Sequence, residues 1–418
     1  MYQIISVRMT EIHMALVACL VLGTLLQFVI LPVFYFRRGV HRDTNWGQFE
    51  ERDIYITSEF SRVHFVDRTI FTVPARNDSK ADRALFRQMP ECPDSDIPNL
   101  NKMNFLDLDD FTMEQAESLI FGEEAMKRAK EATVLADSVI PNLINRTDWF
   151  QTLGRRRIEA HLGKLEMKIG NYTFIPGGHW RPNQCIPKWK VAIIIPFRNR
   201  SHHLPIFLRY LVPMLQRQQL EFGIFTVNQE NDLSFNRAML MNIGFLESLN
   251  ISQWDCFVFH DVDHVPLSDL NYYGCSNMPR HFISGDSNWN YTIIYELLFG
   301  GVTGFLESNL RKMNGFPNVY WGWGGEDDEI YLRAKKVQLR VAPRPKGRNR
   351  YIGFYKVIEH HHNSAQEIPE RFDLVKNFSS RMDNDGLSNL RYPPPRLEIH
   401  PLYVNISVDI FRFELEEK

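Results

Sequence analysis

A long apolar run lies near the start of the chain, from Met14 to Phe36 (MALVACLVLGTLLQFVILPVFYF). It carries no charge and is long enough to cross the roughly 30 Å hydrocarbon core of a bilayer as a helix. A cleaved signal peptide is the alternative, but the run exceeds the usual apolar core of such peptides and no small-residue cleavage site follows it. We therefore predict a transmembrane signal anchor over 14–36, behind a short cytoplasmic tail over 1–13.

Two patterns disagree about the side of the membrane on which the rest of the chain lies. Arg37, Arg38 and Arg42 follow the run and only Arg8 precedes it, which by the positive-inside rule alone keeps the C-terminal part in the cytoplasm. Glycosylation sequons favour the opposite orientation, because they are plentiful for a chain that never meets the glycosylation machinery. They lie at Asn77, Asn145, Asn171, Asn250, Asn290, Asn377 and Asn405. We expect a single-pass type II protein with a lumenal C-terminal part.

Residues 37–169 are mostly polar and show few strand patterns. One stretch within them, 112–139, repeats its apolar residues at helical spacing. We predict a stem and helical membrane-proximal region here, followed by a separate domain over 170–418.

Apolar segments of two kinds alternate from residue 170 onward. β-Branched runs such as KWKVAIIIPF are typical of strands buried on both faces of a largely parallel sheet, whereas the segments between them have helical spacing. Strands are predicted at 188–197, 221–229 and 255–263, and helices at 202–219 and 235–249. This order predicts an α/β domain built from right-handed crossovers.

Each of the three predicted strands ends in a polar cluster. The clusters are RNR at 198–200, NQEN at 228–231 and HDVDH at 260–264. Ligands bind beyond the carboxyl ends of the strands in sheets of this kind. We therefore expect the functional site at this edge.

The charge of the chain argues against one class of partner. Its 48 Lys and Arg residues nearly cancel its 50 Asp and Glu residues, so there is no general electrostatic case for nucleic-acid binding. An anionic ligand has to be held locally.

Four cysteines lie outside the apolar run, which itself contains Cys19. An even number suits two disulfides in an oxidising lumen, and four buried free thiols are the alternative. The four are Cys92, Cys185, Cys256 and Cys275.

Two motifs could bind a divalent cation. Asp261 and Asp263 are two residues apart, so their carboxylates share one side if the strand continues, which suits Mn²⁺ or Mg²⁺ bridging to a diphosphate. Acidic residues are also common where strands turn. Three consecutive imidazoles at 360–362 would favour Mn²⁺ over Ca²⁺, with a solvated loop as the alternative.

Three arginines follow predicted strands, at Arg198, Arg200 and Arg237. Their planar guanidinium groups could hold phosphate oxygens in pairs. Surface salt bridges are the commoner fate of an arginine. Together with the acidic motif, the three predict a pocket for a nucleoside diphosphate.

Four acidic residues stand in a row at 326–329, within WGWGGEDDEI. Helix propensity begins after Gly325, and carboxylates in the first turn of a helix match its dipole. An acidic helix start without a chemical role is one interpretation. The other is a sugar site, because Trp321 and Trp323 offer flat faces for a sugar ring and a nearby carboxylate could remove a hydroxyl proton.

These segments together resemble the β-1,4-galactosyltransferase family. VAIIIPFRNR, FNRA, CFVFHDVDH, FGGVTGF, NGFPNVYWGWGGEDDE, PERFD, DGLSNLRY and HPLYVNISVDI occur in the family's order within residues 170–410. The resemblance implies a GT-A type glycosyltransferase fold, which is a Rossmann-like mixed sheet flanked by helices. It also implies a Golgi type II membrane enzyme that uses Mn²⁺ and a UDP-sugar.

The resemblance also implies roles for single residues. Asp327 would be the catalytic base, with Glu326 beside the donor sugar, and Asp263 with His360 would bind Mn²⁺. The donor would contact Pro196, Phe197, Arg198, Arg200, Phe235, Arg237, Asp261, Val262, Leu298 and Trp323. The acceptor, a terminal N-acetylglucosamine, would contact Tyr295, Gly324, Gly325, Asp327, Asp328, Arg371 and Phe372. The implied disulfides are Cys256–Cys275 and Cys92–Cys185.

Leu298 departs from the pattern of the vertebrate-type members, which carry a tyrosine immediately before FGG that crowds the C2 substituent of the donor sugar. Losing that ring makes room for an acetamido group, so we expect UDP-N-acetylgalactosamine (UDP-GalNAc) as the donor. Invertebrate relatives that make GalNAcβ1,4GlcNAc resemble this chain in having a small aliphatic residue here. UDP-galactose is the alternative, because such a difference discriminates by only about 1–3 kcal/mol.

Val357 is the second departure. Many relatives have a methionine ligand at this position, and valine cannot coordinate a metal. A His-x-His pair occurs in one branch of the family, so we expect His362 to act as a metal ligand beside Asp263 and His360.

The expected reaction is a single in-line displacement that inverts the anomeric centre and joins GalNAc β1,4 to GlcNAc on glycoproteins or glycolipids. Asp327, ionised at an ordinary pKa of about 3.9, would accept the acceptor's proton late in the reaction. Loops near Trp323 and over 358–376 would close over the donor. A membrane-tethered glycan-binding protein without turnover is the alternative of another class, against which the retained carboxylates and arginines argue.

Overall fold

A computed structural model describes residues 90–92, 104, 106–143, 152–359 and 370–412. The chain divides into two compact units, 1–59 and 60–418, and the first lies wholly outside the described residues. The predicted anchor over 14–36 therefore lies outside them too. Among the helices that the structure describes, none combines the length and the apolar character needed to span a membrane.

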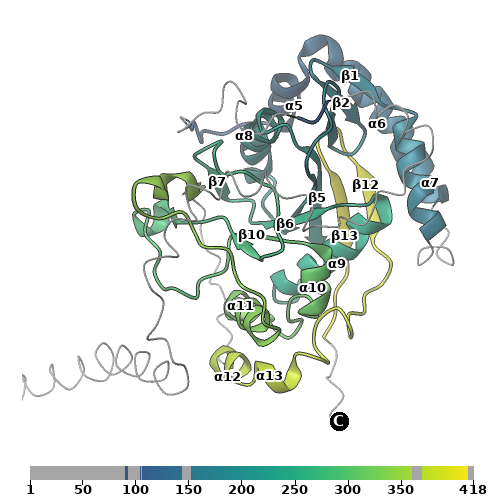
Figure 1. Cartoon of the computed structure of the whole chain (residues 1–418). Coiled ribbons are helices and arrows are strands. Elements are labelled where there is room, and N and C mark those ends of the chain that lie inside the picture. The colour runs from purple at the N-terminus through teal and green to yellow at the C-terminus, as the bar shows by residue number, and fades with distance from the viewer. Residues whose placement is uncertain (1–89, 93–103, 105, 144–151, 360–369, 413–418) are drawn as a thin grey trace, which may run out of the picture. The chain divides into compact units, whose positions relative to one another are not determined.

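A mixed ten-stranded sheet runs through the second unit (Figure 1). Its order is β1-β2-β3-β5-β4-β6-β10-β8, and β13 pairs with both β5 and β12. β4, β5, β6 and β13 run parallel, whereas β10 is antiparallel to β6. The strands are β1 Met167–Ile169, β2 Tyr172–Ile175, β3 His179–Pro182, β4 Lys190–Phe197, β5 Glu221–Gln229, β6 Cys256–His260, β8 Arg280–His281, β10 Val302–Phe305, β12 Arg396–Ile399 and β13 Val404–Val408. The predicted mixed sheet is confirmed.

Helices cover both faces of this sheet. α8 and α9 pack on opposite faces, and α5 contacts α8 while α7 contacts α9. The helices are α5 Met113–Phe121, α6 Glu123–Leu143, α7 Thr152–Gly163, α8 His203–Arg217, α9 Arg237–Ile251, α10 Glu307–Lys312, α11 Glu326–Lys336, α12 Arg371–Lys376 and α13 Phe378–Arg381, with 3-10 turns η4 Ser287–Trp289 and η5 Gly347–Gly353.

β4 shows how the apolar run KWKVAIIIPF becomes a central strand. Successive side chains of a strand point to opposite faces. Val191, Ile193 and Ile195 enter the core cluster on the α8 side, while Ala192 and Ile194 enter the cluster on the α9 side. The strand is therefore buried on both faces, which explains its lack of polar alternation.

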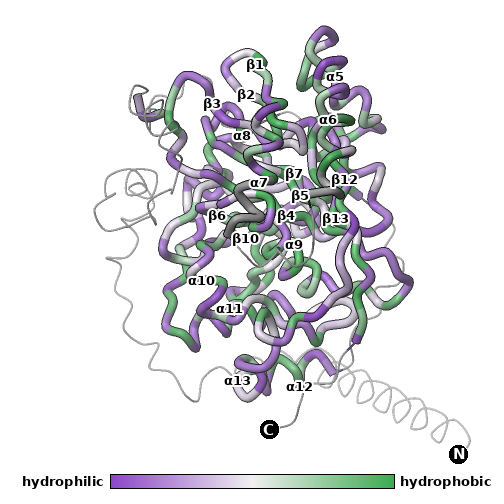
Figure 2. The backbone as a smooth tube through the Cα atoms, turned by 90° about the vertical axis from the view of Figure 1, so that its right-hand side faces the viewer, coloured by the Kyte–Doolittle hydropathy of each residue, from purple (hydrophilic) through white to green (hydrophobic). Residues whose placement is uncertain are grey.

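The single helix predicted over 112–139 proves to be two helices, α5 and α6. Gly122 ends α5 with a φ of 74°, a conformation that glycine adopts without steric penalty. Ala116 and Phe121 enter the core cluster on the α8 side. Figure 2 shows hydrophobic and hydrophilic residues alternating along these helices. This part of the predicted stem region thus packs against the sheet through one apolar face.

The four cysteines outside the apolar run form the two implied disulfides. Cys92 is bonded to Cys185, and Cys256 to Cys275. Cys92 also donates its backbone N–H to the carbonyl oxygen of Ile186 over 2.9 Å. The first disulfide therefore ties residues 90–92 to the segment between β3 and β4.

The strand register brings several loops to one edge of the sheet. Phe197 at the end of β4 lies opposite Asn228 near the end of β5, and Val302 at the start of β10 lies opposite His260 at the end of β6. Because β10 is antiparallel, the loop before it returns to the carboxyl edge of the parallel strands. A second sheet has three strands, in the order β7-β11-β9. Its first strand comes shortly after β6 in the chain. The strands are β7 His264–Pro266, β9 Gly285–Asp286 and β11 Phe354–Val357.

Candidate active site

The polar clusters after β4 and β5 converge. The Nη1 of Arg198 donates to the carbonyl oxygen of Leu233 over 2.6 Å, and its guanidinium lies 5.1 Å from the ring centroid of Phe235. The backbone of Phe235 in turn accepts the N–H of Gly322, over 2.9 Å, from the tryptophan-rich loop. A cation stacked on an aromatic ring at this edge is suited to a nucleotide.

The other donor candidates lie at the same ends of β4 and β6. Pro196 and Phe197 are the last residues of β4, and Val262 is buried between the two aspartates of the acidic motif. Arg200 is half-buried, and its Nη1 donates to the carbonyl oxygen of Asn199 over 3.2 Å.

Asp261, Asp263 and His264 form a cluster with the geometry of a metal site. One ligand atom from each lies within 4.8 Å of the others, in the part of the chain that the structure describes. Asp263 Oδ1 accepts a hydrogen bond from His264 Nδ1 over 2.7 Å. Burial alone would lower the pKa of His264, but Asp263 and then Asp261 outweigh it and raise that pKa to about 9. His264 is a candidate ligand that sequence reasoning did not consider, although it belongs to the same HDVDH motif.

The predicted ligands His360 and His362 lie outside the described residues. The chain that leads to them does reach the cluster, because Ile358 donates its N–H to the carbonyl oxygen of Asp263 over 2.8 Å. Val357 pairs with His264 between β11 and β7, and its side chain is buried. The segment is thus anchored beside Asp263 two residues before His360.

Arg237 connects the acidic motif to the carboxylate run on α11. Its Nε donates to Asp261 Oδ1 over 2.7 Å, and its Nη1 lies 3.5 Å from Glu326 Oε1. Burial would lower the pKa of Arg237, but the charges of Asp261 and Glu326 outweigh it and raise that pKa. Two motifs that lie far apart in the sequence therefore share one partly buried cation.

The carboxylate run forms the first turn of α11, behind Gly325 at a φ of 99°. Burial, then the charge of Asp327, raises the pKa of Glu326 to about 7. Burial likewise raises the pKa of Asp327, and burial together with Asp327 raises the pKa of Asp328 to about 6. Asp327 is therefore a stronger base than its expected ordinary pKa implied, because burial penalises its charged form.

The FGG turn before β10 lies between the carboxylate run and the metal cluster. A Cβ atom added to Gly300 would stand 2.6 Å from Asp327 Oδ2, and one added to Gly301 would stand 3.3 Å from His264 Nε2. The carbonyl oxygen of Gly301 also accepts the N–H of Asp261 over 2.9 Å. Asp327 and the candidate metal cluster therefore lie on either side of the FGG turn, and Gly301, at a φ of 73°, is in a conformation that favours glycine.

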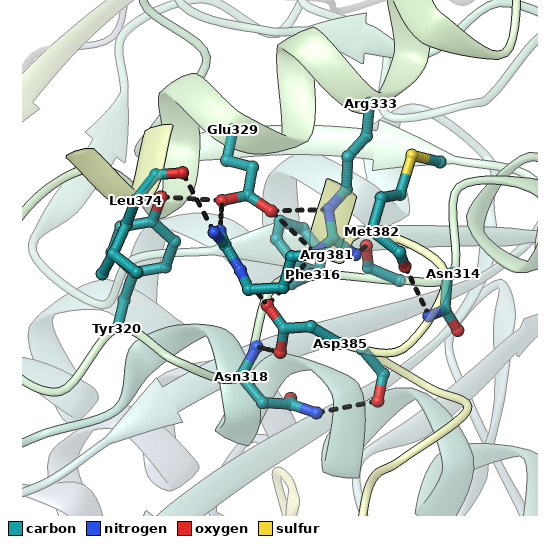
Figure 3. A network of polar contacts seen from close by, with 12 residues as sticks. Asn314, Phe316, Asn318, Tyr320, Glu329, Arg333, Leu374, Arg381, Met382 and Asp385 are labelled. Carbon is teal, nitrogen blue, oxygen red and sulfur yellow. Dashed lines mark hydrogen bonds and ion pairs between the residues drawn. The ribbon is translucent and has the colours of Figure 1, made fainter. Parts of the chain in front are cut away.

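Glu329, the last acid of the run, has a structural role (Figure 3). It is fully buried, and its carboxylate accepts hydrogen bonds from Tyr320, Arg333 and Arg381. Arg333 and Arg381 also reach Asp385 Oδ2, at 3.3 and 3.1 Å. The network joins α11 to α13 and to the segment after α13. It therefore fixes the helix whose first turn carries Asp327.

Replacing Glu329 by glutamine should lower the free energy of unfolding by about 3–5 kcal/mol, because buried Arg333 and partly buried Arg381 then lose a shared counter-charge. Urea unfolding of the full chain in detergent would measure this. Glu307→Gln removes an exposed i,i+4 pair with Arg311 and serves as the control, at about 0.5 kcal/mol or less. Equal losses for the two variants would contradict a structural role for the network.

The acceptor candidates gather around the tryptophan loop. The guanidinium of Arg371 lies 5.5 Å from the ring centroid of Trp323 and 4.8 Å from that of Phe372. Trp323 and Phe372 are 58% and 64% exposed, so both rings can meet a ligand. Burial, then the charges of Asp327 and Asp328, raises the pKa of the Tyr295 hydroxyl. Gly324 and Gly325 have φ values of 101° and 99°, and a Cβ atom added to Gly325 would stand 2.5 Å from the ring of Tyr320, so this loop favours glycine at both positions.

Family comparisons agree with this architecture. Residues 151–276 match the N-terminal region of glycosyl transferase group 7, and residues 280–361 match the N-terminal domain of galactosyltransferase. Human beta-1,4-galactosyltransferase 6 is 49% identical over 235 residues, which are 56% of this chain and 60% of that protein. Zebrafish beta-1,4-galactosyltransferase 5 is 45% identical over 256 residues, which are 61% of this chain and 66% of that protein. The chain thus matches about 60% of the length of the first of these relatives.

A solved structure is also similar. It is the catalytic domain of Drosophila beta-1,4-galactosyltransferase 7 in complex with xylobiose, with 28% identity and a TM-score of 0.46, covering 55% of this chain and 95% of that one. A mutant of the same Drosophila protein was solved with manganese, UDP-Gal and xylobiose. The sheet and site described above, with these sequence matches, define a glycosyltransferase fold. The chain belongs to the β-1,4-galactosyltransferase family, which is glycosyltransferase group 7.

Proposed function

We propose that this chain is an inverting, metal-dependent glycosyltransferase that moves N-acetylgalactosamine from UDP-GalNAc to the 4-hydroxyl of a terminal β-N-acetylglucosamine. The observation that carries the proposal is the contact of Arg237 with both Asp261 and Glu326. Arg237 joins the acidic motif, which would bind the metal and the diphosphate, to the carboxylate run on α11. The exposed ring of Trp323 lies in the loop before that run. A donor and an acceptor could therefore meet in one cleft.

The donor set of the acidic motif fits Mn²⁺. Two carboxylates and an imidazole combine hard oxygen ligands with the nitrogen ligand that a transition metal accepts. Asp263 and Asp261 would hold the ion, with His264 or the histidines at 360 and 362 completing the set. When bound, the ion would act as a Lewis acid that neutralises charge on the departing diphosphate.

The chain's own residues would supply the remaining chemistry. Arg198 and Arg237 would neutralise further negative charge on the diphosphate. Asp327 would take the proton of the acceptor hydroxyl, and its burial makes it a stronger base than a solvated aspartate. Trp323 and Phe372 would orient the acceptor ring, because sugar faces stack on aromatic rings.

The identity of the donor rests on Leu298. This residue is half-buried two positions before Gly300, which packs against Asp327. An aliphatic side chain leaves room for an acetamido group where a tyrosine would crowd it. UDP-galactose is the second candidate, favoured by the names of the relatives, which are galactosyltransferases.

The location that we propose is the Golgi membrane, with residues 170–418 as a lumenal catalytic domain. The apolar run over 14–36 supports the anchor, and the two disulfides suit an oxidising lumen. Glycoproteins and glycolipids ending in N-acetylglucosamine would be the acceptors.

Acceptor-dependent release of UDP tests the activity. The full chain in detergent would be incubated with Mn²⁺, UDP-GalNAc or UDP-galactose, and a GlcNAc-terminated oligosaccharide. Release of UDP only when donor, metal and acceptor are all present supports a transferase. Acceptor binding without UDP release from either donor would favour the membrane-tethered glycan-binding protein instead.

Changing Leu298 to tyrosine should shift donor preference towards UDP-galactose. The ratio of kcat/KM for UDP-GalNAc over UDP-galactose should fall by about 10-fold or more, because the added ring fills the space of the acetamido group. Competition between the two donors at equal concentration would measure the ratio. Leu119→Tyr is the control, because the side chain of Leu119 on α5 is exposed. A ratio that stays unchanged in Leu298→Tyr would refute the pocket argument.

A further inference from the structure

Arg344 contacts the loop before β10 from the side of β8. Its Nη1 donates to the carbonyl oxygen of Glu296 over 3.1 Å, and its Nη2 donates to the carbonyl oxygen of Leu298. Its Nε donates to His281 Nδ1 over 2.7 Å. The guanidinium of Arg344 therefore donates two hydrogen bonds to the loop before β10 and one to the imidazole of His281.

His281 extends this arrangement to Gly300. It is buried on β8, and its Nε2 lies 2.8 Å from the carbonyl oxygen of Gly300. A carbonyl can only accept, so Nε2 carries the proton, and Nδ1 is left to accept from Arg344. Burial, then the charge of Arg344, lowers the pKa of His281 well below its ordinary value. The neutral ring thus completes a chain from Arg344 to the glycine turn.

Arg344 is itself held in place by backbone contacts. Ala342, two residues earlier, forms a parallel bridge with Arg280 and donates its N–H to the carbonyl oxygen of Pro279 over 2.8 Å. Phe299 is buried, with its ring 5.4 Å from that of His281 and 5.8 Å from that of Tyr331 on α11. The loop is therefore fixed by packing at Phe299 and by hydrogen bonds at the carbonyls on either side.

The loop that these contacts hold borders the site at several points. A Cβ atom added to Gly300 would stand 2.6 Å from Asp327 Oδ2, and the carbonyl oxygen of Gly301 accepts the N–H of Asp261. A small shift of the three carbonyls would therefore move the backbone that lies beside Asp327 and Asp261.

We propose that Arg344 is a positioning residue that sets donor specificity by holding the carbonyls of Glu296 and Leu298 directly and that of Gly300 through His281. The inference rests on the proposed function, since it assigns the loop to the donor sugar. Lysine in place of Arg344 would keep the charge but lose the planar fork that makes several directed hydrogen bonds at once.

Arg344→Lys tests the inference, with the exposed Arg340→Lys as the matched control. Donor affinity would be measured by calorimetry with UDP alone, UDP-GalNAc and UDP-galactose in the presence of Mn²⁺, and transfer by UDP release. Arg344→Lys should reduce transfer from UDP-GalNAc roughly 10- to 100-fold, since a misplaced loop costs this much. Affinity for UDP alone should stay within about twofold, and the ratio between the two donors should change.

Leu298→Tyr in the Arg344→Lys background adds a second readout. If Arg344 acts by placing Leu298, the effect of the tyrosine on the donor ratio should be clearly smaller in that background than in the parent, because coupled residues are not additive. Full additivity would overturn the inference, as would an unchanged donor ratio in Arg344→Lys. A parallel loss of affinity for UDP alone would also overturn it, because it indicates a general structural defect.

The calorimetric measurements of donor affinity distinguish a failure of this inference from a failure of the proposed function. If the parent chain transfers neither sugar, the proposed function fails. The affinity of UDP-sugar relative to UDP still tests Arg344. That relative affinity should differ between the parent and Arg344→Lys, and equality would overturn the positioning role.

Discussion

Replacing Asp327 by asparagine should reduce kcat for sugar transfer by about 10²- to 10⁴-fold, the usual contribution of a general base. Asparagine keeps the size of the side chain and its hydrogen bond with the N–H of Asp328, which now spans 3.1 Å. It cannot accept the acceptor's proton. Affinity for UDP in the presence of Mn²⁺ should change little, because Asp327 is not one of the three residues of the candidate metal cluster.

The rate of UDP release at saturating donor and acceptor would measure this effect. Asp110→Asn, at an exposed position before α5, is the control and should retain full activity. The parent chain should also lose activity as pH falls through the raised pKa of Asp327, above the ordinary aspartate range, because protonation removes the base. Normal turnover by Asp327→Asn would remove Asp327 from the role of base.

Replacing Asp263 by alanine should lower affinity for Mn²⁺ and reduce transfer by about 10²-fold or more. A bound metal supplies several kcal/mol of charge stabilisation at a departing diphosphate, and each 1.4 kcal/mol is tenfold in rate. Asp263 would lose both its ligand oxygen and its 2.7 Å hydrogen bond with His264. Both changes weaken the same cluster.

Electron paramagnetic resonance of free Mn²⁺ during titration of the full chain would measure the affinity. Asp110→Ala, at an exposed position before α5, is the control. His264→Ala, His360→Ala and His362→Ala in the same assay would show which imidazoles complete the ligand set. Undiminished Mn²⁺ affinity in Asp263→Ala would place the metal elsewhere.

The sheet could be predicted because its signal is local. The five apolar residues of β4 at 191–195 alternate between two buried faces, and the short length and β-branched residues of the run favour a buried strand. The prediction of a single long helix over 112–139 was wrong in one respect: there are two helices, because Gly122 ends α5 at a positive φ. Helical periodicity continues across that glycine, so spacing alone did not reveal the break.

The motifs of the candidate site could be found in the sequence, but their contacts could not. Gly300 approaches Asp327 only because β10 runs antiparallel to β6, and no local pattern fixes that direction. Glu329 is chemically like its three acidic neighbours. Its burial against Arg333 and Arg381 depends on residues up to 52 positions away. Contacts between residues far apart in the sequence therefore determine that Glu329 stabilises the fold while Asp327 lies beside the FGG turn.

Anomalous diffraction from crystals of the chain grown with Mn²⁺ and UDP tests the central claim most directly. The claim is that a metal-bound nucleotide and Asp327 share one cleft. We predict a single strong manganese peak coordinated by Asp263, with UDP bound beside Arg198 and Arg237 and with Asp327 lining the same cavity. A manganese ion bound away from Asp263, or a nucleotide in a cavity that Asp327 does not border, would contradict the account.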